Sequence, residues 1–388
     1  MPRPPTAPAL GPPVLLLAVL ALLLSACAPT TPATTPTSVP AAKPADPGPT
    51  AASAPRSTPA NVGASAAPAG SAGPATVRVS AILDSVAARS VFIGEEKGYY
   101  AEQGLQLETV NLAANEALPQ LAVGRLDAAV SGIGPAFFNA QLRGVDVKVV
   151  ADVSILRAPA PGVKNAFWTV VRGSLADEVQ SVADLKGRKI GVIDARGLNR
   201  LNLDRMLAYG GLTEMDVDVA TVPYPEQLAA LTGGAIDAVT TIEPWIALAA
   251  DRGSGVPLLD MGTVRPNTAA LWLFYSAQFI NERPDVAQRF MLAHLKSVRY
   301  AEDGFVKGIN RDEVIQTFVK HTGLKDPALY DRMGISYNGT NGEINMQDLA
   351  LQQQYYVAHG DQPRAVEVDS LVDKGFADRA VQVLGPYQ

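Results

Sequence analysis

Two patterns of apolar residues alternate along the chain from residue 76 onward. Short runs rich in β-branched residues, such as 76–83 and 167–172, have the composition of strands. Between such runs lie segments with an apolar face at helical spacing, such as 116–123 and 198–209, each followed by a glycine that can end a helix. Strands that alternate with helices at this spacing indicate βαβ units and a mostly parallel sheet.

One stretch of this pattern occurs twice, at 121–137 and at 231–245. Both copies read L-x-x-G-x-[Leu/Ile]-Asp-Ala, with the aspartates at Asp127 and Asp237, followed by a short apolar run and a proline that can begin a helix. Because the same series of strands and helices precedes each copy, we predict two similar α/β lobes. We also expect the turns at the ends of their strands to face each other.

The predicted lobes are not continuous in the sequence. We assign residues 76–172 to the first part of lobe 1 and residues 173–270 to lobe 2. Residues 271–388 then return to lobe 1, with a strand near 268–276 and a mainly helical segment from Pro284 onward. We expect helices near 311–320, 345–358 and 369–383 to cover the first lobe.

The first 75 residues have a different composition. Residues 1–27 combine a short basic start with an apolar run at 14–24, which suits a signal peptide. The run ends in Leu-Ser-Ala-Cys27 and resembles the lipobox of bacterial lipoproteins, in which the cysteine is lipidated. Residues 28–75 are rich in Pro, Ala and Thr, contain no aromatic residue, and are predicted to form a disordered tether.

Charge and cysteine content exclude several classes of function. The formal net charge is -6 and no run of Lys or Arg offers a phosphate-binding surface, so we do not expect nucleic acid as a partner. The chain contains a single cysteine, Cys27, which excludes a disulfide within the chain and a cysteine-based metal site. We expect neither a metal nor a cofactor.

Several blocks in the same order give the ordered part a resemblance to a known family. The blocks are 92–105 (FIGEEKGYYAEQGL), 121–127, 181–191 (SVADLKGRKIG), 231–237, 243–244 and 284–290 (PDVAQRF). Together they resemble the solute-binding proteins of ABC importers, in the branch that binds sulfonate, nitrate and taurine or thiamine-pyrimidine precursors. The resemblance implies a type II periplasmic-binding-protein fold, with two α/β lobes and C-terminal helices on lobe 1.

The same resemblance implies a function and a location. A monomeric protein, lipid-anchored on the extracytoplasmic side of the bacterial cell membrane, would hold a small polar solute between its lobes and deliver it to ABC permease subunits. By position in the family, the solute-binding residues are expected to be Ser85, Arg89, Ser131, Gly132, Gly134, Arg196, Asn199, Glu243, Trp245 and Tyr275.

The chemistry of these residues leaves the solute open. Arg196 could clamp a carboxylate or sulfonate, or could be a solvated loop residue. Glu243 could accept a hydrogen bond from an amine, or only cap the helix that follows Pro244, while Trp245 could stack on a ring or pack within its lobe. An arginine favours an oxyanion, whereas Glu243 with Trp245 favours a cationic or heteroaromatic solute.

Two other functions fit the same fold. One is an enzyme related to the pyrimidine synthases, which need a Cys-rich motif and a histidine. The only cysteine here is Cys27, and His294, His321 and His359 all fall in the C-terminal helical part, so we expect no enzyme activity. The other is a receptor that reports its ligand to a membrane kinase, which the sequence does not distinguish from an import receptor.

Overall fold

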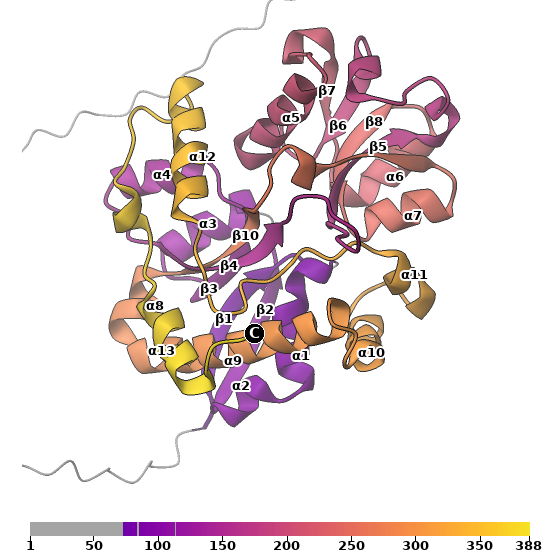
Figure 1. Cartoon of the computed structure of the whole chain (residues 1–388). Coiled ribbons are helices and arrows are strands. Elements are labelled where there is room, and N and C mark those ends of the chain that lie inside the picture. The colour runs from indigo at the N-terminus through magenta and orange to yellow at the C-terminus, as the bar shows by residue number, and fades with distance from the viewer. Residues whose placement is uncertain (1–72, 84, 113) are drawn as a thin grey trace, which may run out of the picture. The chain divides into compact units, whose positions relative to one another are not determined.

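A computed structural model describes residues 73–388 except residues 84 and 113. The predicted signal peptide, Cys27 and nearly all of the predicted tether lie outside this part. The described residues build two five-stranded sheets, and we call each sheet with its helices a lobe (Figure 1). None of the helices in this part is long and apolar enough to cross a membrane.

The first sheet has the strand order β2-β1-β3-β10-β4. Its strands are β1 (Ala75–Ala81), β2 (Leu105–Asn111), β3 (Ala128–Ser131), β4 (Lys148–Leu156) and β10 (Thr268–Tyr275). Strand β1 pairs in parallel with β2 and β3, whereas β10 is antiparallel to both β3 and β4. The strand that returns from the second lobe is therefore inserted into the sheet of the first.

The second sheet repeats this arrangement with the order β7-β6-β8-β5-β9. Its strands are β5 (Phe167–Arg172), β6 (Lys189–Val192), β7 (Asp218–Thr221), β8 (Ala238–Ile242) and β9 (Gly255–Asp260). Here β5 is the antiparallel strand, between β8 and β9. The two similar α/β lobes predicted from the repeat are confirmed, but each sheet is mixed because one strand in each comes from the crossing between lobes.

Two details of the second sheet differ from the expectation. Strand β5 belongs to the second sheet, although the sequence placed residues up to 172 in the first lobe. Strand β9 was not predicted, because its sequence GVPLLD contains a proline and does not alternate apolar and polar residues. It lies at the edge of the sheet, where a missing backbone N–H costs least.

Helices cover both faces of the first sheet. One core cluster joins this sheet to α1, α9 and α13, and a second joins it to α3, α4 and α12 (Figure 1). The helices of this lobe are α1 (Arg89–Glu96), α2 (Tyr99–Glu102), α3 (Ala114–Ala122), α4 (Pro135–Leu142), α8 (Ala277–Glu282), α9 (Pro284–Phe305), α10 (Arg311–His321), α11 (Pro327–Arg332), α12 (Met346–Ala358) and α13 (Gly375–Leu384).

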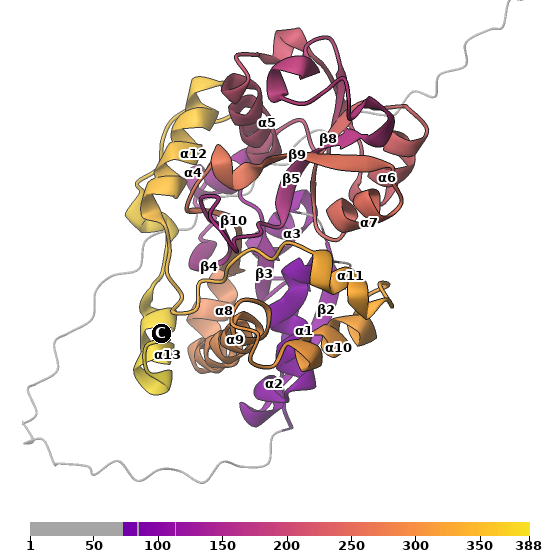
Figure 2. The same ribbon diagram turned by 45° about the vertical axis from the view of Figure 1, so that its right-hand side comes forward.

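The second lobe has three α-helices. They are α5 (Gly197–Tyr209), α6 (Tyr224–Thr232) and α7 (Trp245–Asp251), and Figure 2 shows them around the second sheet. Short 3₁₀ helices complete the described part: η1 (Val86–Ala88), η2 (Gly173–Leu175), η3 (Val182–Leu185), η4 (Glu214–Asp216), η5 (Met261–Thr263) and η6 (Val368–Leu371).

The segments that cross between the lobes are packed closely. The side-chain N–H of Asn165, in the first crossing, donates to Asp260 at the end of β9 over 2.9 Å. Tyr337, after α11, forms an antiparallel bridge with Ile155 at the end of β4. A Cβ at Gly334 would lie 2.0 Å from the carbonyl oxygen of Asn165, so only glycine fits there. The two crossing segments and the stretch after α11 therefore lie side by side.

Candidate functional site

The loops that follow β3 and β6 meet across the two lobes. A Cβ added at Gly134 would lie 3.8 Å from the Cα atom of Gly197. Leu198, at the start of α5, packs in the same core cluster as Ile133 and Phe137 of the first lobe. The end of β3 thus contacts the N-terminus of α5, and the small residues Gly132 and Gly134 allow the backbones this close approach.

A second contact joins α7 to the first lobe. Ala247, in α7, belongs to the core cluster that contains Val86 and Ala88 of η1. Nearby, the guanidinium of Arg332 in α11 pairs with Asp251 at the end of α7 over 2.7 Å. Strand-end loops of both lobes therefore face each other, as expected.

The two copies of the repeated stretch do not face each other along their whole length. The first copy contacts the start of α5 through Gly134, rather than the second copy. The aspartates lie at the other end of each strand, where Asp127 receives a hydrogen bond from the backbone N–H of Arg78 in β1. Asp237 receives the equivalent bond from Lys189 in β6. The end of the first copy, from Gly132 to Pro135, is thus the part that contacts the second lobe.

Arg196 lies at the N-terminus of α5 with an exposed side chain. Its backbone N–H donates to Asp194 over 3.0 Å, but its guanidinium has no hydrogen-bond or ion-pair partner among the described residues. The helix that begins beside it is 13 residues long, and its first N–H groups have no acceptor within the helix. Asn199, in the first turn of α5, is half-buried. This end of α5 can therefore offer several hydrogen-bond donors to an anion.

Glu243 is buried and both of its carboxylate oxygens are used within the protein. One accepts from the backbone N–H of Ala247 over 3.0 Å, and the other from that of Gly334 over 2.9 Å. Burial raises the pKa of Glu243 to about 7, while the two backbone hydrogen bonds act in the opposite direction. Glu243 thus joins the start of α7 to the segment after α11, and neither oxygen is free of a protein donor.

Trp245 is half-buried and stacks on Tyr224, a residue that the sequence did not single out. The ring centroids are 4.9 Å apart and the planes differ by 17°. Tyr224 begins α6, and desolvation raises the pKa of its phenol. The sequence signal that could have found Tyr224 is Pro223, because a proline can mark the start of a helix, here α6, shortly after the end of β7.

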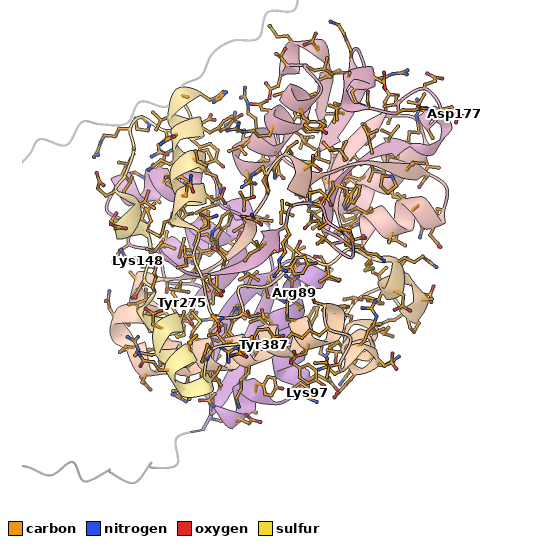
Figure 3. The ribbon with its side chains drawn as sticks, in the orientation of Figure 1. Arg89, Lys97, Lys148, Asp177, Tyr275 and Tyr387 are labelled. Carbon is orange, nitrogen blue, oxygen red and sulfur yellow. The ribbon has the colours of Figure 1, made fainter. Side chains whose placement is uncertain are left out.

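Arg89 is 1% exposed and has protein acceptors around its whole guanidinium. Its Nε donates to Asn338 over 2.6 Å, Nη1 to the carbonyl of Val86, and Nη2 to the carbonyls of Val153 and Ser336. Burial lowers the pKa of Arg89 to about 10. Arg89 thus holds the C-terminal segment against β4, and Figure 3 shows it near the middle of the described part.

Ser85, Ser131 and Tyr275 are also buried. The hydroxyl of Ser85 accepts from the backbone N–H of Ala87 and caps η1. The hydroxyl of Tyr275 donates to the carbonyl of Ala287 over 3.1 Å inside the first lobe. These contacts give Ser85 and Tyr275 structural roles, whereas the hydroxyl of Ser131 has no partner among the described residues.

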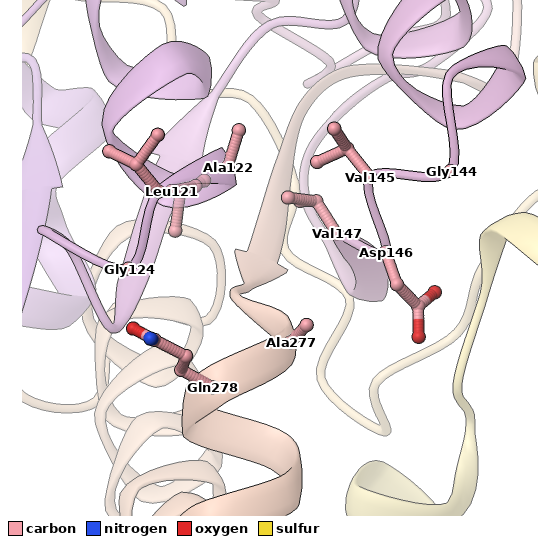
Figure 4. Close-up of a pocket in the computed structure, with 10 residues that line it drawn as sticks. Leu121, Ala122, Gly124, Gly144, Val145, Asp146, Val147, Ala277 and Gln278 are labelled. Carbon is pink, nitrogen blue, oxygen red and sulfur yellow. The ribbon is translucent and has the colours of Figure 1, made fainter. Parts of the chain in front are cut away.

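Two cavities lie on the first lobe, away from the contact between the lobes. One, of about 340 Å³, is lined by the end of α3, the turn before β4 and the start of α8, including Leu121, Val145 and Gln278 (Figure 4). The other, of about 440 Å³, is lined by Thr76, Arg78, Glu108 and Arg283. Both lie where β1, β3 and β4 begin, at the edge opposite the loop after β3.

The described part offers little for catalysis or metal binding. It contains no cluster of three or more His, Cys, Asp or Glu side chains that could hold a metal ion. It also contains no cysteine, since Cys27 lies outside it. The N-terminus of α5 and the loop after β3 offer donors and small residues, which suit recognition of a solute.

A family model described as "NMT1-like family" matches residues 71–319. The nitrate/nitrite binding protein NrtA of Synechocystis is 22% identical over 290 residues, which cover 71% of this chain and 64% of that protein. The chain thus spans less than two thirds of the length of this relative.

Solved structures share the fold. The alkanesulfonate-binding protein SsuA of Xanthomonas axonopodis pv. citri, bound to MOPS, matches with a TM-score of 0.62 and 24% identity, over 78% of this chain and 99% of that one. The desulfurization enzyme DSZB matches with a TM-score of 0.59 and 17% identity, over 80% of this chain and 99% of that one. The predicted α/β fold of two lobes is confirmed.

Proposed function

The chain belongs to the NMT1-like family, and we propose that it is an extracytoplasmic protein that binds a small oxyanion between its lobes and delivers it to an ABC importer. The observation that carries the proposal is the contact between the loop after β3 and the N-terminus of α5, at Gly134 and Gly197. Beside this contact, Arg196 holds an exposed guanidinium without a protein partner.

We favour an oxyanion because, among the described residues near the contact, hydrogen-bond donors lack protein partners and the candidate acceptor Glu243 does not. Arg196 and the first N–H groups of α5 are donors, and an oxyanion accepts from several donors at once. Glu243 would be the acceptor for a cationic solute, but its two oxygens already accept from Ala247 and Gly334. A cation would have to displace one of these bonds, so the heteroaromatic amine considered from the sequence is the less favoured solute.

We propose that the solute contacts Gly132, Gly134, Arg196 and Asn199. Trp245, stacked on Tyr224, would close one side of the site with an aromatic surface. Ser85, Arg89, Glu243 and Tyr275 would act indirectly, because each is buried in contacts within the protein. The hydroxyl of Ser131 lies on a buried face of the sheet, so we do not place it against the solute.

The relatives support the same class of solute. NrtA is a nitrate and nitrite binding protein and SsuA an alkanesulfonate-binding protein, and both names describe oxyanions. For this chain we propose an import receptor anchored through lipid on Cys27, acting as a monomer with ABC permease subunits. A receptor that reports to a membrane kinase would bind the same solute. Genes for a permease and an ATPase next to the gene for this chain would favour the import receptor.

An enzyme on this fold is the second candidate, because the desulfurization enzyme DSZB is a structural neighbour. A structure of a cysteine-to-serine variant of that enzyme, in complex with biphenyl-2-sulfinic acid, is also similar to this chain. The described residues of this chain contain no cysteine that could take part in such a reaction. Turnover of an aromatic sulfinate by the purified chain would favour this alternative.

Calorimetric titration tests the proposed function. The full chain is titrated with nitrate, bicarbonate, methanesulfonate and a pyrimidine amine. We expect one oxyanion to bind with a stoichiometry of one and to raise the unfolding temperature, because it binds only the folded state. Binding of the amine alone would contradict the proposal.

A further inference from the structure

Each sheet contains a row of three polar residues on neighbouring strands, at the same place in the two lobes. In each row a tryptophan on the antiparallel strand lies directly between a hydroxyl residue and an aspartate. The first polar row is Ser131, Trp272 and Asp152, and the second polar row is Thr241, Trp168 and Asp260. Residues directly opposite each other on paired strands share one face of the sheet.

The second polar row is completed by the side chain and backbone of Asn165. The indole N–H of Trp168 donates to the carbonyl of Asn165 over 2.9 Å. The amide of Asn165 donates to both oxygens of Asp260, over 2.9 and 3.1 Å. The tryptophan and the aspartate of this row therefore both have hydrogen-bond partners, and only the hydroxyl of Thr241 has none.

The first polar row is deeply buried, and each of its residues has a polar atom without a partner. Ser131, Trp272 and Asp152 are 2%, 0% and 2% exposed. The hydroxyl of Ser131, the indole N–H of Trp272 and one oxygen of Asp152 have no hydrogen-bond partner among the described residues. The other oxygen of Asp152 accepts from the backbone N–H of Asn345, at the start of α12.

Part of the difference between the rows is visible in the sequence. Asn165 stands three positions before Trp168, and the residue three positions before Trp272 is Ala269. Ala269 is fully buried in the same core cluster as Trp272. Its methyl group offers no hydrogen bond, so the first row lacks the side-chain amide that donates to Asp260 in the second.

We propose that the first polar row binds one water molecule, which takes the place that Asn165 has in the second row, where its backbone carbonyl accepts from the indole and its side-chain amide donates to the aspartate. The water accepts from the indole of Trp272 and donates to Asp152, and Ser131 can act as donor or acceptor. Two to four partners of this kind are typical of buried waters.

The same three atoms disfavour ions. An indole N–H only donates, so it would point its hydrogen at a cation. An anion would lie against the carboxyl group of Asp152, where the negative charges of Asp348 and Glu343 outweigh the positive charge of Lys374. A neutral molecule that both donates and accepts satisfies all three groups.

The inference goes beyond the proposed solute site. Ser131 directly precedes Gly132, where the loop that contacts the second lobe begins. A water on this row stabilises the end of β3 on the face of the sheet that α4 and α12 cover. It is a structural component of the first lobe and does not depend on the identity of the solute.

Nuclear magnetic resonance of the full chain with ¹⁵N-labelled tryptophan tests the inference. The chain contains three tryptophans, so its spectrum has three indole signals, and Trp168→Phe and Trp245→Phe assign them by elimination. We expect the indole hydrogen of Trp272 to show a cross-peak to slowly exchanging water. The indole of Trp168, bonded to Asn165, is the internal control and should show no such cross-peak.

The measurement on the unaltered chain decides the question. A cross-peak to water at the indole of Trp272, with none at that of Trp168, supports the water site. The absence of a cross-peak at Trp272 in the folded chain overturns it.

Discussion

Gly197 of the second lobe lies against Gly134 of the first, so that a Cβ at Gly197 would come within 3.5 Å of the Cα atom of Gly134. Gly197 has a φ of +60°, which a residue with a side chain adopts only with strain. The backbone conformation therefore favours glycine, while an added Cβ would lie in van der Waals contact with Gly134 and Pro135. The N-terminus of α5 can thus approach the loop after β3 without a side chain between them.

Gly197→Ala is therefore expected to weaken solute binding at least tenfold, because relief of the strained φ would shift the first N–H groups of α5, which we place against the solute. Gly211→Ala is the matched control, since Gly211 also has a positive φ, +73°, but no atom within 4 Å of an added Cβ. Both variants should lose about 1 kcal/mol of stability from backbone strain. Equal affinities in calorimetric titration of the two would show that the contact at Gly197 is not part of the site.

Replacing Arg196 by Ala should lower the affinity for an oxyanion about 10- to 100-fold, because a charge-assisted hydrogen bond contributes about 1.5–3 kcal/mol. Arg205, exposed on the same helix, is the matched control, and Arg205→Ala should leave affinity unchanged. Titration of both variants with the oxyanion that binds the unaltered chain provides the measurement. Similar affinities of the two variants would remove Arg196 from the site.

Glu243 makes the stability of the protein depend on pH in a defined direction. Burial raises its pKa from 4.5 to about 7, so the folded state keeps a proton that the unfolded state releases. The contribution of Glu243 to the free energy of unfolding is thus largest below pH 4.5. It declines as the pH rises to about 7, by an amount on the order of 3 kcal/mol. Glu243→Gln should flatten the pH dependence of the free energy of unfolding in this range.

Denaturant unfolding at several pH values between 4.5 and 7.5 measures this effect. Glu226→Gln, an exposed position in the same lobe, is the control and should keep the dependence of the unaltered chain. An unchanged slope in Glu243→Gln would mean that Glu243 ionises in the folded protein as it does in the unfolded chain.

Asp127 and Asp237 should matter for folding and not for binding. Besides the backbone N–H of β1 or β6, each carboxylate accepts from an arginine, Arg283 for Asp127 and Arg172 for Asp237. Asp127→Asn or Asp237→Asn should lower the free energy of unfolding by about 1–3 kcal/mol, because charged hydrogen bonds are lost. Asp218→Asn, at an exposed ion pair, should have little effect.

Denaturant unfolding and solute titration of the same variants separate the two roles. If Asp127→Asn or Asp237→Asn abolished solute binding with stability intact, the repeated aspartate would belong to the site after all.

The sequence predicted strands and helices well where a local pattern determines them. The short apolar runs after the two repeated aspartates form strands β3 and β8, because an apolar run between a turn and a proline has few other conformations. Strand β9 was missed for lack of such a pattern. The sequence also did not reveal that β10 is inserted between β3 and β4, since pairing between distant strands leaves no local signal.

The roles of single site residues were harder to predict. Arg89 and Glu243 are polar residues next to strand ends, which is where binding residues are expected. Their actual partners, Asn338 and Gly334, are far away in the sequence and come from the C-terminal segment. Nothing near either residue in the sequence indicates that it is buried and already paired. Arg196 differs because its loop is exposed.

The central claim is that a solute binds between the two lobes, and a crystal structure of the protein with nitrate or methanesulfonate tests it most directly. We predict the anion within hydrogen-bonding distance of the Arg196 guanidinium and the first N–H groups of α5, facing Gly132 and Gly134. An anion bound instead in the cavity near Leu121 and Gln278, with no contact to α5, would contradict the claim.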